Sequence, residues 1–317
     1  MLVRTLCLLA MAASAAGCSA AREPLDLDAA WSATPATMFL EGDTLHYYGE
    51  LREVDVEPLR QLLARAPAGL SRLEIASTGG DGLAGIAIGE MVQARDLEVV
   101  VVGQGCASAC ANHVFTPARR KTLTPGSMVI WHYSCPSSFP DDLTAAREDL
   151  RRRFGTPGHT FTFKRNGEQV TDPEELRREF GAQLDGLAAK MATYVRDYRA
   201  GHQRIFERTG IDDRIVCLAD HLDLPEVPAE DVGYSYTLPV EDMARFGVCG
   251  VTAPEDYAAR SEAYIRSRED IRHRLGVVRL AEHPRFQPRY PAGYCDHPAA
   301  ARAALTDAGA TPPQPLK

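Results

Sequence analysis

The chain has 317 residues, of which 45% are hydrophobic and 25% charged, and its formal net charge is -8. This composition predicts one globular domain with extensions. The acidic balance argues against a nucleic-acid partner, because phosphate binding selects a clustered basic face. The basic run at 151–153 is explained by a solvated helix face.

The first 17 residues carry one early positive charge, an apolar centre and small residues at the end, as in a secretory signal peptide. The segment Ala15-Ala-Gly-Cys18 resembles a bacterial lipobox, with Ala15 in place of the usual leucine. This resemblance implies a lipidated Cys18, and Ser19 after it is typical of lipoproteins sent to the outer membrane. An ordinary signal peptide cut nearby is the alternative. We therefore expect a periplasmic, membrane-anchored protein with residues 18–36 as a tether.

From residue 37 onward, strand-like segments alternate with helix-like ones. Expected strands are a pair over 38–51 with a turn at 41–43, then 71–77, 97–103 and 127–132. Expected helices are 56–65, 83–95 and 107–116. Strands that alternate with helices predict βαβ crossovers and a largely parallel sheet, which is an α/β fold.

Three of these strands end on residues that can carry chemistry. Gly79 and Gly80 follow the first, Ser108 follows the second beyond a glycine break, and His132 ends the third. Open α/β sheets bind ligands at the carboxyl ends of their strands, and a nucleophilic hydroxyl needs a base. Each residue also has a structural alternative: close packing for the serine, and a half-buried structural role for the histidine.

The residues around these positions resemble a known family. The segments Ser77-Thr-Gly-Gly80, Gly105-Cys-Ala-Ser-Ala109 and Ser127-Met-Val-Ile-Trp-His132 are similar to the glycine pair, nucleophile segment and histidine segment of Clp-type serine protease subunits. The similarity covers about 38–132 and resumes over 236–248. It implies the Clp protease/crotonase-like fold.

The resemblance also implies a role for each site residue. Ser108 would be the nucleophile and His132 its base, while the backbone N–H groups of Gly80 (or Gly79) and Ala109 would form the oxyanion hole. The related crotonase fold uses similar N–H pairs on acyl-CoA, so an acyl-transfer enzyme is a further possibility. It is disfavoured because acyl-CoA is not expected outside the cytoplasm.

The third member of a catalytic triad would be an aspartate that orients His132. Counted back from Phe246, the family's aspartate falls near Asp231, with Asp220 and Asp213 as rivals. An aspartate beside a glycine in a loop is also a common turn former. Asp231 is the predicted acid.

The domain is expected to span 37–253, with an inserted segment at about 136–185 and a C-terminal extension at 254–317. The expected elements are a loop at 136–142, a helix at 143–154, a hairpin at 156–170, one or two helices over 173–209, a helix at 255–275 and a Pro/Ala-rich tail at 287–317. In Clp-type subunits the region equivalent to the insertion is a helical handle that mediates assembly. Here it is longer, which argues against barrel assembly and leaves a homo-oligomer as an open alternative.

Six cysteines lie beyond Cys18, at positions 106, 110, 135, 217, 249 and 295. An even number in an oxidising compartment predicts disulfides, and the sequence leaves fifteen pairings open. Cys106 and Cys110 have a spacing that could suit a metal, but no second close pair of ligands accompanies them. We therefore predict no metal site.

Together these features predict an exported serine hydrolase, most simply a peptidase, that acts on a peptide or protein substrate. The chain has no phosphate-binding glycine-lysine loop, so we expect no cofactor and no ATPase partner. The alternative is a binding module in the cell envelope that kept the fold and lost catalysis.

Overall fold

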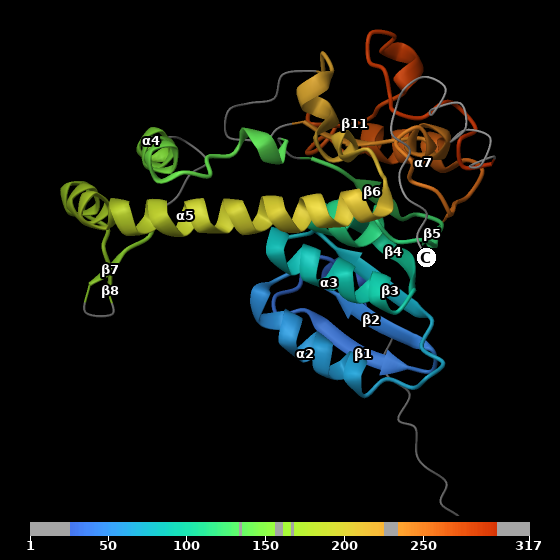
Figure 1. The fold of residues 1–317 in the computed structure, drawn as a ribbon, viewed down its shortest axis with the longest axis horizontal. Helices are drawn as coiled ribbons and strands as arrows, with labels where there is room; N and C mark the ends of the chain where they lie inside the picture. Colours follow the sequence, from blue (N-terminus) through green and yellow to red (C-terminus); the bar gives the residue numbers. More distant parts are fainter. Residues whose placement is uncertain (1–25, 133–134, 156–160, 166–167, 225–233, 297–317) are drawn as a thin grey trace, which may run out of the picture.

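The computed structural model describes residues 26–132, 135–155, 161–165, 168–224 and 234–296, which Figure 1 shows as a ribbon. At its centre is a seven-stranded sheet in the order β1-β2-β3-β4-β5-β10, with β6 also paired to β4. Among the described strands of this sheet, only the β1–β2 pairing is antiparallel. The strands are β1 (Thr37–Glu41), β2 (Thr44–Tyr48), β3 (Arg72–Ser77), β4 (Glu98–Ala107), β5 (Lys121–Leu123), β6 (Met128–Ile130) and β10 (Val251–Thr252).

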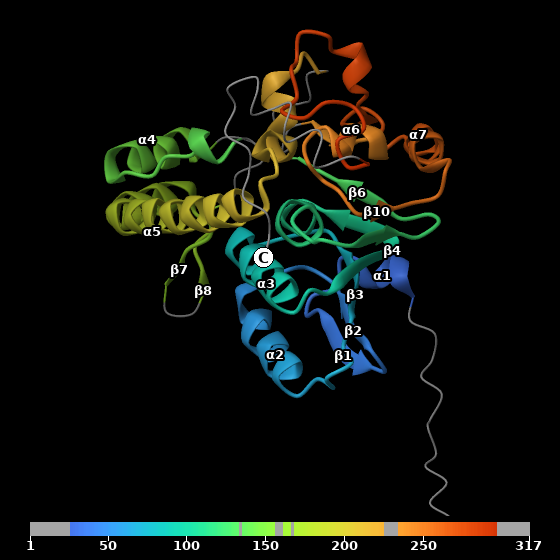
Figure 2. The ribbon, with the colours of Figure 1, turned by 45° about the vertical axis from the view of Figure 1, so that its right-hand side comes forward.

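Helices connect the parallel strands, which confirms the predicted α/β class. Figures 1 and 2 show α2 and α3 against one face of the sheet, while α1 lies on the other. The helices are α1 (Leu27–Ala30), α2 (Glu53–Ala64), α3 (Gly82–Ala94), the π-helix η1 (Cys110–Phe115), η2 (Pro136–Ser138), α4 (Leu143–Arg153), α5 (Pro173–Thr209), η3 (Asp213–His221), α6 (Val240–Ala244), α7 (Tyr257–Ser267) and η4 (Leu280–Glu282). None of these described helices is both long enough and apolar enough to cross a bilayer.

Close packing between α3 and η1 sets the position of the residues that follow β4. Asp81 caps α3 by accepting a hydrogen bond from the Ala84 N–H at 2.7 Å. A Cβ atom at Gly89 would lie 1.9 Å from the His113 carbonyl oxygen, so only glycine permits this approach. The missing side chain lets η1 lie directly on α3.

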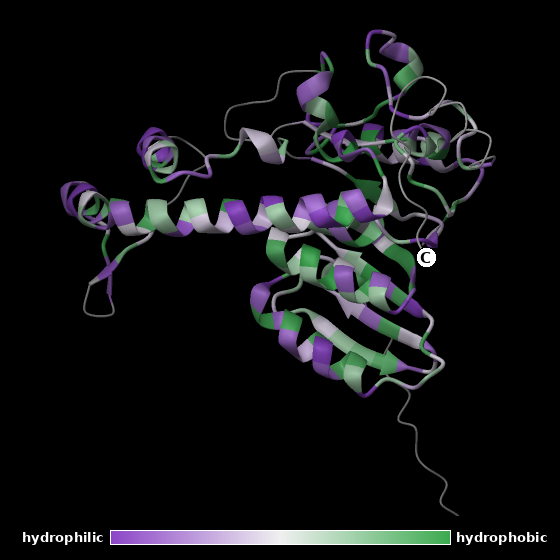
Figure 3. Cartoon of the chain, in the orientation of Figure 1, coloured by the Kyte–Doolittle hydropathy of each residue, from purple (hydrophilic) through white to green (hydrophobic). Residues whose placement is uncertain are grey.

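The segment after β6 contains two helices that project beyond the sheet (Figure 1). The α5 helix is continuous over 37 residues, from Pro173 behind an Asp172 cap to a left-handed Gly210. Its outer part packs against α4 in a separate small core that includes Phe180 and Leu184. Figure 3 shows the sheet and α3 mostly hydrophobic, whereas α4 and α5 alternate between polar and apolar residues. In the sequence, a short hairpin of β7 (Lys164–Arg165) and β8 (Glu168–Gln169) separates α4 from α5.

Several predicted elements differ in the structure. The strand expected at 97–103 runs on to Ala107, so the helix expected at 107–116 is replaced by the six-residue η1. The helix expected at 255–275 begins at Tyr257 and ends at Ser267, and β11 (Leu275–Val277) then pairs with β9 (Ser235–Thr237). The strands β5, β9, β10 and β11 have only two or three residues each, too few to form a periodic pattern.

Candidate active site

Ser108 forms a sharp turn between β4 and η1. Its φ angle is +54°, a left-handed conformation that costs a residue other than glycine about 1–3 kcal/mol. In the described part of the chain, Asp96 is the only other non-glycine residue with positive φ. The Ser108 N–H donates to the Ile130 carbonyl at 2.9 Å, and the Ser108 carbonyl accepts from the Asn112 N–H at 2.8 Å. Because such strained residues cluster at functional sites, this turn is the first candidate site.

A disulfide brackets the turn. Cys106 in β4 is bonded to Cys110 at the start of η1, with a Cα–Cα distance of 5.3 Å, and both residues are fully buried. The bond closes the chain around Ser108 and restrains its backbone. It also joins the two sulfur atoms that would be needed for the metal pair considered from the sequence.

The two glycines after β3, Gly79 and Gly80, have different neighbours. A Cβ atom at Gly79 would lie 2.6 Å from Ser108 Cβ and 2.9 Å from the Ala109 nitrogen, so Gly79 is packed directly against the serine turn. Gly80 instead packs on Leu51, whose carbonyl oxygen would lie 2.4 Å from a Cβ. The structure therefore brings Gly79, Ser108 and Ala109 together, with Gly80 one residue further out.

The backbone N–H groups of these residues differ in what they bind. The Gly79 N–H donates to the Ser77 hydroxyl at 3.1 Å and is therefore engaged. The N–H groups of Gly80 and Ala109 make no hydrogen bond to another residue in the described ranges. On this basis Gly80 and Ala109 are better oxyanion donors than Gly79, although all three were candidates from the sequence.

His132 lies two residues beyond Ile130, which pairs with Ala107 in the β4–β6 register. Ser108 and His132 thus follow neighbouring strands at the same edge of the sheet. The contacts of the described residues include no hydrogen bond between the Ser108 hydroxyl and the His132 ring. Burial lowers the pKa of His132, and the nearby Arg274 guanidinium lowers it further.

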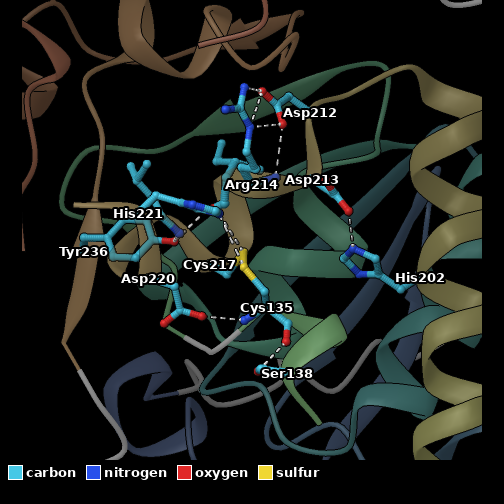
Figure 4. The surroundings of a disulfide bond; sticks show 12 residues. Cys135, Ser138, His202, Asp212, Asp213, Arg214, Cys217, Asp220, His221 and Tyr236 are labelled. Carbon is cyan, nitrogen blue, oxygen red and sulfur yellow. Dashed lines mark hydrogen bonds and ion pairs between the residues drawn. A yellow bond between two sulfur atoms is a disulfide. The ribbon is translucent and has the colours of Figure 1, made fainter. Parts of the chain in front are cut away.

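The predicted triad acid, Asp231, lies outside the described residues, so its role stays a prediction. Both rivals are engaged elsewhere, as Figure 4 shows. One Asp220 carboxylate oxygen accepts the Cys135 N–H at 2.7 Å. The Asp213 carboxylate lies 3.4 Å from His202 Nε2. In the described part of the structure, neither rival forms a hydrogen bond or ion pair with His132.

A buried histidine pair behind Ser108 was not predicted. His113 in η1 and His202 in α5 are 0% and 3% exposed, and their Nε2 and Nδ1 atoms are 3.2 Å apart. With Asp213 they form a chain from the protein surface to the turn after Ser108. Burial holds the pKa of His113 well below its ordinary value, with His202 as a second cause. No local sequence pattern could predict this pairing, because the two residues are 89 positions apart.

Cys135, Cys217 and His221 lie close together, as Figure 4 shows. Their ligating atoms lie within 4.8 Å of one another, a spacing that a metal could use. However, Cys135 and Cys217 form a disulfide, so neither sulfur is a thiolate ligand. While the Cys135–Cys217 disulfide is intact, these three residues therefore do not fit a metal ion.

The structure selects one of the fifteen cysteine pairings: Cys106 with Cys110, Cys135 with Cys217, and Cys249 with Cys295. We therefore expect alkylation of the denatured, unreduced protein to modify none of these six cysteines. Peptide mapping by mass spectrometry should recover the three linked pairs. A cross-pairing between the Cys106–Cys110 segment and any other cysteine would contradict this arrangement.

The lowered pKa of His132 predicts how the reactivity of Ser108 depends on pH. A general base works only when neutral, so the rate of Ser108 modification should fall at low pH. The midpoint of this acid limb of the rate–pH profile should lie below the ordinary histidine pKa of 6.5. Arg274→Gln removes a positive charge near the ring, so it should raise this pKa and move the limb to higher pH. The rate of covalent modification against pH measures both. Arg272→Gln, an exposed change on the same segment, is the control, and an unshifted limb in Arg274→Gln would refute the assignment.

No family model and no curated protein matches the chain. Among solved structures it is similar to a mutant of a membrane-bound stomatin-specific protease, with 14% identity over 67% of this chain and 78% of that one, at a TM-score of 0.32. It is also similar to ClpP1 from Listeria monocytogenes, with 16% identity over 49% of this chain and 86% of that one, at a TM-score of 0.25. A third is an enoyl-CoA hydratase from Mycobacterium ulcerans, with 13% identity over 54% and 97% of the two chains and a TM-score of 0.27. Clp-type and crotonase-type proteins are thus both among the similar structures, and at these TM-scores neither likeness argues for an activity.

Proposed function

We propose that the chain is a serine hydrolase, most simply a peptidase, that acts without an ATPase partner. The observation that carries the proposal is the left-handed turn at Ser108 with Gly79 packed against it. Acyl transfer requires a hydroxyl exposed at a strand end beside backbone N–H groups that can receive an oxyanion. The Ser108 turn and the Ala109 and Gly80 N–H groups supply these parts.

In the proposed mechanism His132 takes the proton from Ser108 Oγ, and the alkoxide attacks a substrate carbonyl. The N–H groups of Ala109 and Gly80 stabilise the oxyanion, and His132 returns its proton to the leaving amine. Water then hydrolyses the acyl-enzyme by the same route. Catalytic hydrogen bonds are often long before substrate binds, so the serine and histidine need to close only in the complex.

A binding module without turnover is the second candidate. Two observations favour it: the described contacts include no Ser108–His132 hydrogen bond, and the Arg274 cation, after burial, lowers the pKa of His132. A cation next to the base opposes the imidazolium that acyl transfer creates. Under this alternative the same sheet edge would bind a peptide without cleaving it.

Peptide cleavage by the purified mature protein separates these candidates. We expect an unstructured protein such as casein to be cleaved in buffer without nucleotide, with new amino termini detected by mass spectrometry. Addition of ATP should change nothing. Peptide binding without any cleavage product, at protein concentrations well above those of the substrate, would support the binding module.

We also propose that the protein is exported to the periplasm and held at the outer membrane by a lipid on Cys18. The supporting feature is the segment Ala15-Ala-Gly-Cys18 behind an apolar run. Intact-mass analysis of the membrane fraction should find a chain that begins at Cys18 and carries acyl groups. A soluble chain that begins elsewhere and lacks the acyl mass would rule out the anchor, and Cys18→Ala is the control.

A further inference from the structure

Two sulfur atoms and one imidazole nitrogen meet beside η3 (Figure 4). Cys217 and His221 belong to η3, and Cys135 directly precedes η2. His221 Nε2 lies 3.5 Å from Cys135 Sγ and 3.9 Å from Cys217 Sγ. In the described part of the chain, no other group of three cysteine, histidine or acidic side chains brings its ligating atoms so close together. The disulfide occupies both sulfur atoms, so reduction would change what this group can bind.

The distances from the imidazole to the two sulfur atoms are those of a tetrahedral zinc site. Zinc binds a thiolate sulfur at about 2.3 Å and an imidazole nitrogen at about 2.0–2.1 Å, which separates the two ligand atoms by about 3.6 Å. The observed separations of 3.5 and 3.9 Å lie on either side of this value. Only the two sulfur atoms would have to move apart, and breaking their bond permits that movement.

Contacts other than the disulfide hold both sides of this group. The Cys135 N–H donates to the Asp220 carboxylate at 2.7 Å, and the Arg199 guanidinium donates to two carbonyl oxygens of η2 at 2.7 and 2.9 Å. On the other side, the Tyr236 hydroxyl bonds to the backbone of η3 on either side of Cys217, at 2.8 and 2.7 Å. We therefore expect the two thiols and the imidazole to remain neighbours after reduction.

The group is open to solvent on one side. Cys135 is partly exposed and His221 is exposed, whereas Cys217 is buried. His221 also lines an open surface cavity of about 710 Å³, so a hydrated cation can reach the imidazole. A reductant can approach the same side. The Cys106–Cys110 disulfide differs in this respect, because both of its residues are fully buried.

We propose that reduction of the Cys135–Cys217 disulfide creates a site for Zn²⁺ or a similar thiophilic divalent cation, with both sulfur atoms and His221 Nε2 as ligands. A dithiol reductant supplies two electrons and two protons: the S–S bond breaks, two protein thiols form, and the reductant becomes a disulfide. Each thiol loses its proton when its sulfur binds the cation. Two thiolates balance the divalent charge, and water takes the fourth position. The site is absent from the oxidised protein and does not depend on the proposed hydrolase activity.

The test compares the oxidised and reduced forms of the purified protein, with Zn²⁺ or Co²⁺ alone as the probe. A phosphine opens the disulfide, alkylation of a sample identifies the opened pair, and the phosphine is removed under nitrogen. Competition with a zinc-sensitive dye should show one Zn²⁺ per reduced chain, bound at least about a hundredfold more tightly than by the oxidised chain. Co²⁺ should give the sulfur-to-metal charge-transfer absorption of thiolate ligands.

Two variants test which side chains bind the cation. His221→Ala keeps both cysteines and should weaken Zn²⁺ binding by the reduced protein at least about tenfold, because one of three protein ligands is lost. Cys249→Ser/Cys295→Ser removes a different partly exposed cysteine pair and is the matched control. It should bind Zn²⁺ as the reduced wild-type protein does.

Zn²⁺ binding that is equal before and after reduction would overturn the proposal. So would unchanged binding in His221→Ala, or a loss of binding in Cys249→Ser/Cys295→Ser, since each would place the cation elsewhere. Far-UV circular dichroism should change little on reduction. A collapse of that signal would show that the disulfide alone holds the ligands together, which contradicts a site formed by the fold.

Discussion

Replacing Ser108 by alanine is expected to reduce peptide hydrolysis by about 10⁶-fold, because nucleophile and base act as one unit in such sites. The fold should survive, since alanine in the left-handed conformation bears a similar backbone strain to serine. His132→Ala should produce a loss of similar size, and the double variant should lose no more than either single one.

Initial rates of cleavage measure the loss of hydrolysis, and far-UV circular dichroism checks that the fold survives. Ser138→Ala is a matched control, because Ser138 is exposed and its hydroxyl only donates to the Cys135 carbonyl at 2.7 Å. It should leave the rate unchanged. Hydrolysis that continues in Ser108→Ala at the wild-type rate would exclude this serine as the nucleophile.

Replacing Gly105 by alanine is expected to prevent folding or to cost more than about 4 kcal/mol, among the largest effects of a single substitution. Gly105 has a φ of +135°, and a Cβ there would lie 1.8 Å from the Met128 carbonyl oxygen. That oxygen belongs to β6, which pairs with β4 at this point and leads to His132. The clash therefore acts on backbone that positions both candidate catalytic residues.

Chemical denaturation of the variants provides the measurement. Gly186→Ala in α5 is the control, because no atom beyond the adjacent helix backbone lies within 4 Å of the added Cβ. Alanine in an exposed helix should raise the free energy of unfolding by roughly 0.5–1 kcal/mol. A Gly105→Ala protein as stable as wild type would mean that β6 does not approach β4 as described.

Much of the sheet could be predicted from the sequence, because β3 and β4 are short apolar runs that lead into glycines and α3 is a longer apolar run between them. The exact path around Ser108 could not. The segment Cys106 to Phe115 is rich in small apolar residues that suit a strand or a helix equally. The disulfide between Cys106 and Cys110, four residues apart, joins the end of the strand to the start of the helix, and no sequence pattern predicted it. The β5 strand was missed because it has three residues and begins with Lys121, a buried lysine.

Individual residues of the candidate site could be predicted only where they belong to a short sequence motif. Ser108 and the glycine pair fall at strand ends as expected, but the difference between Gly79 and Gly80 depends on which carbonyl each one meets in three dimensions. Arg274 lies 142 residues beyond His132 in the chain, counting from 132 to 274. No local pattern connects such distant partners, so the electrostatics of the histidine needed the structure.

The most direct test of the central claim is covalent labelling of the purified, disulfide-bonded protein with a fluorophosphonate, followed by mapping of the adduct. A reactive serine hydrolase should be labelled once per chain, with the phosphonyl mass on the peptide that contains Ser108. Labelling should disappear in Ser108→Ala and slow strongly in His132→Ala. An absence of labelling in the folded wild-type protein, or labelling that persists in Ser108→Ala, would contradict the assignment.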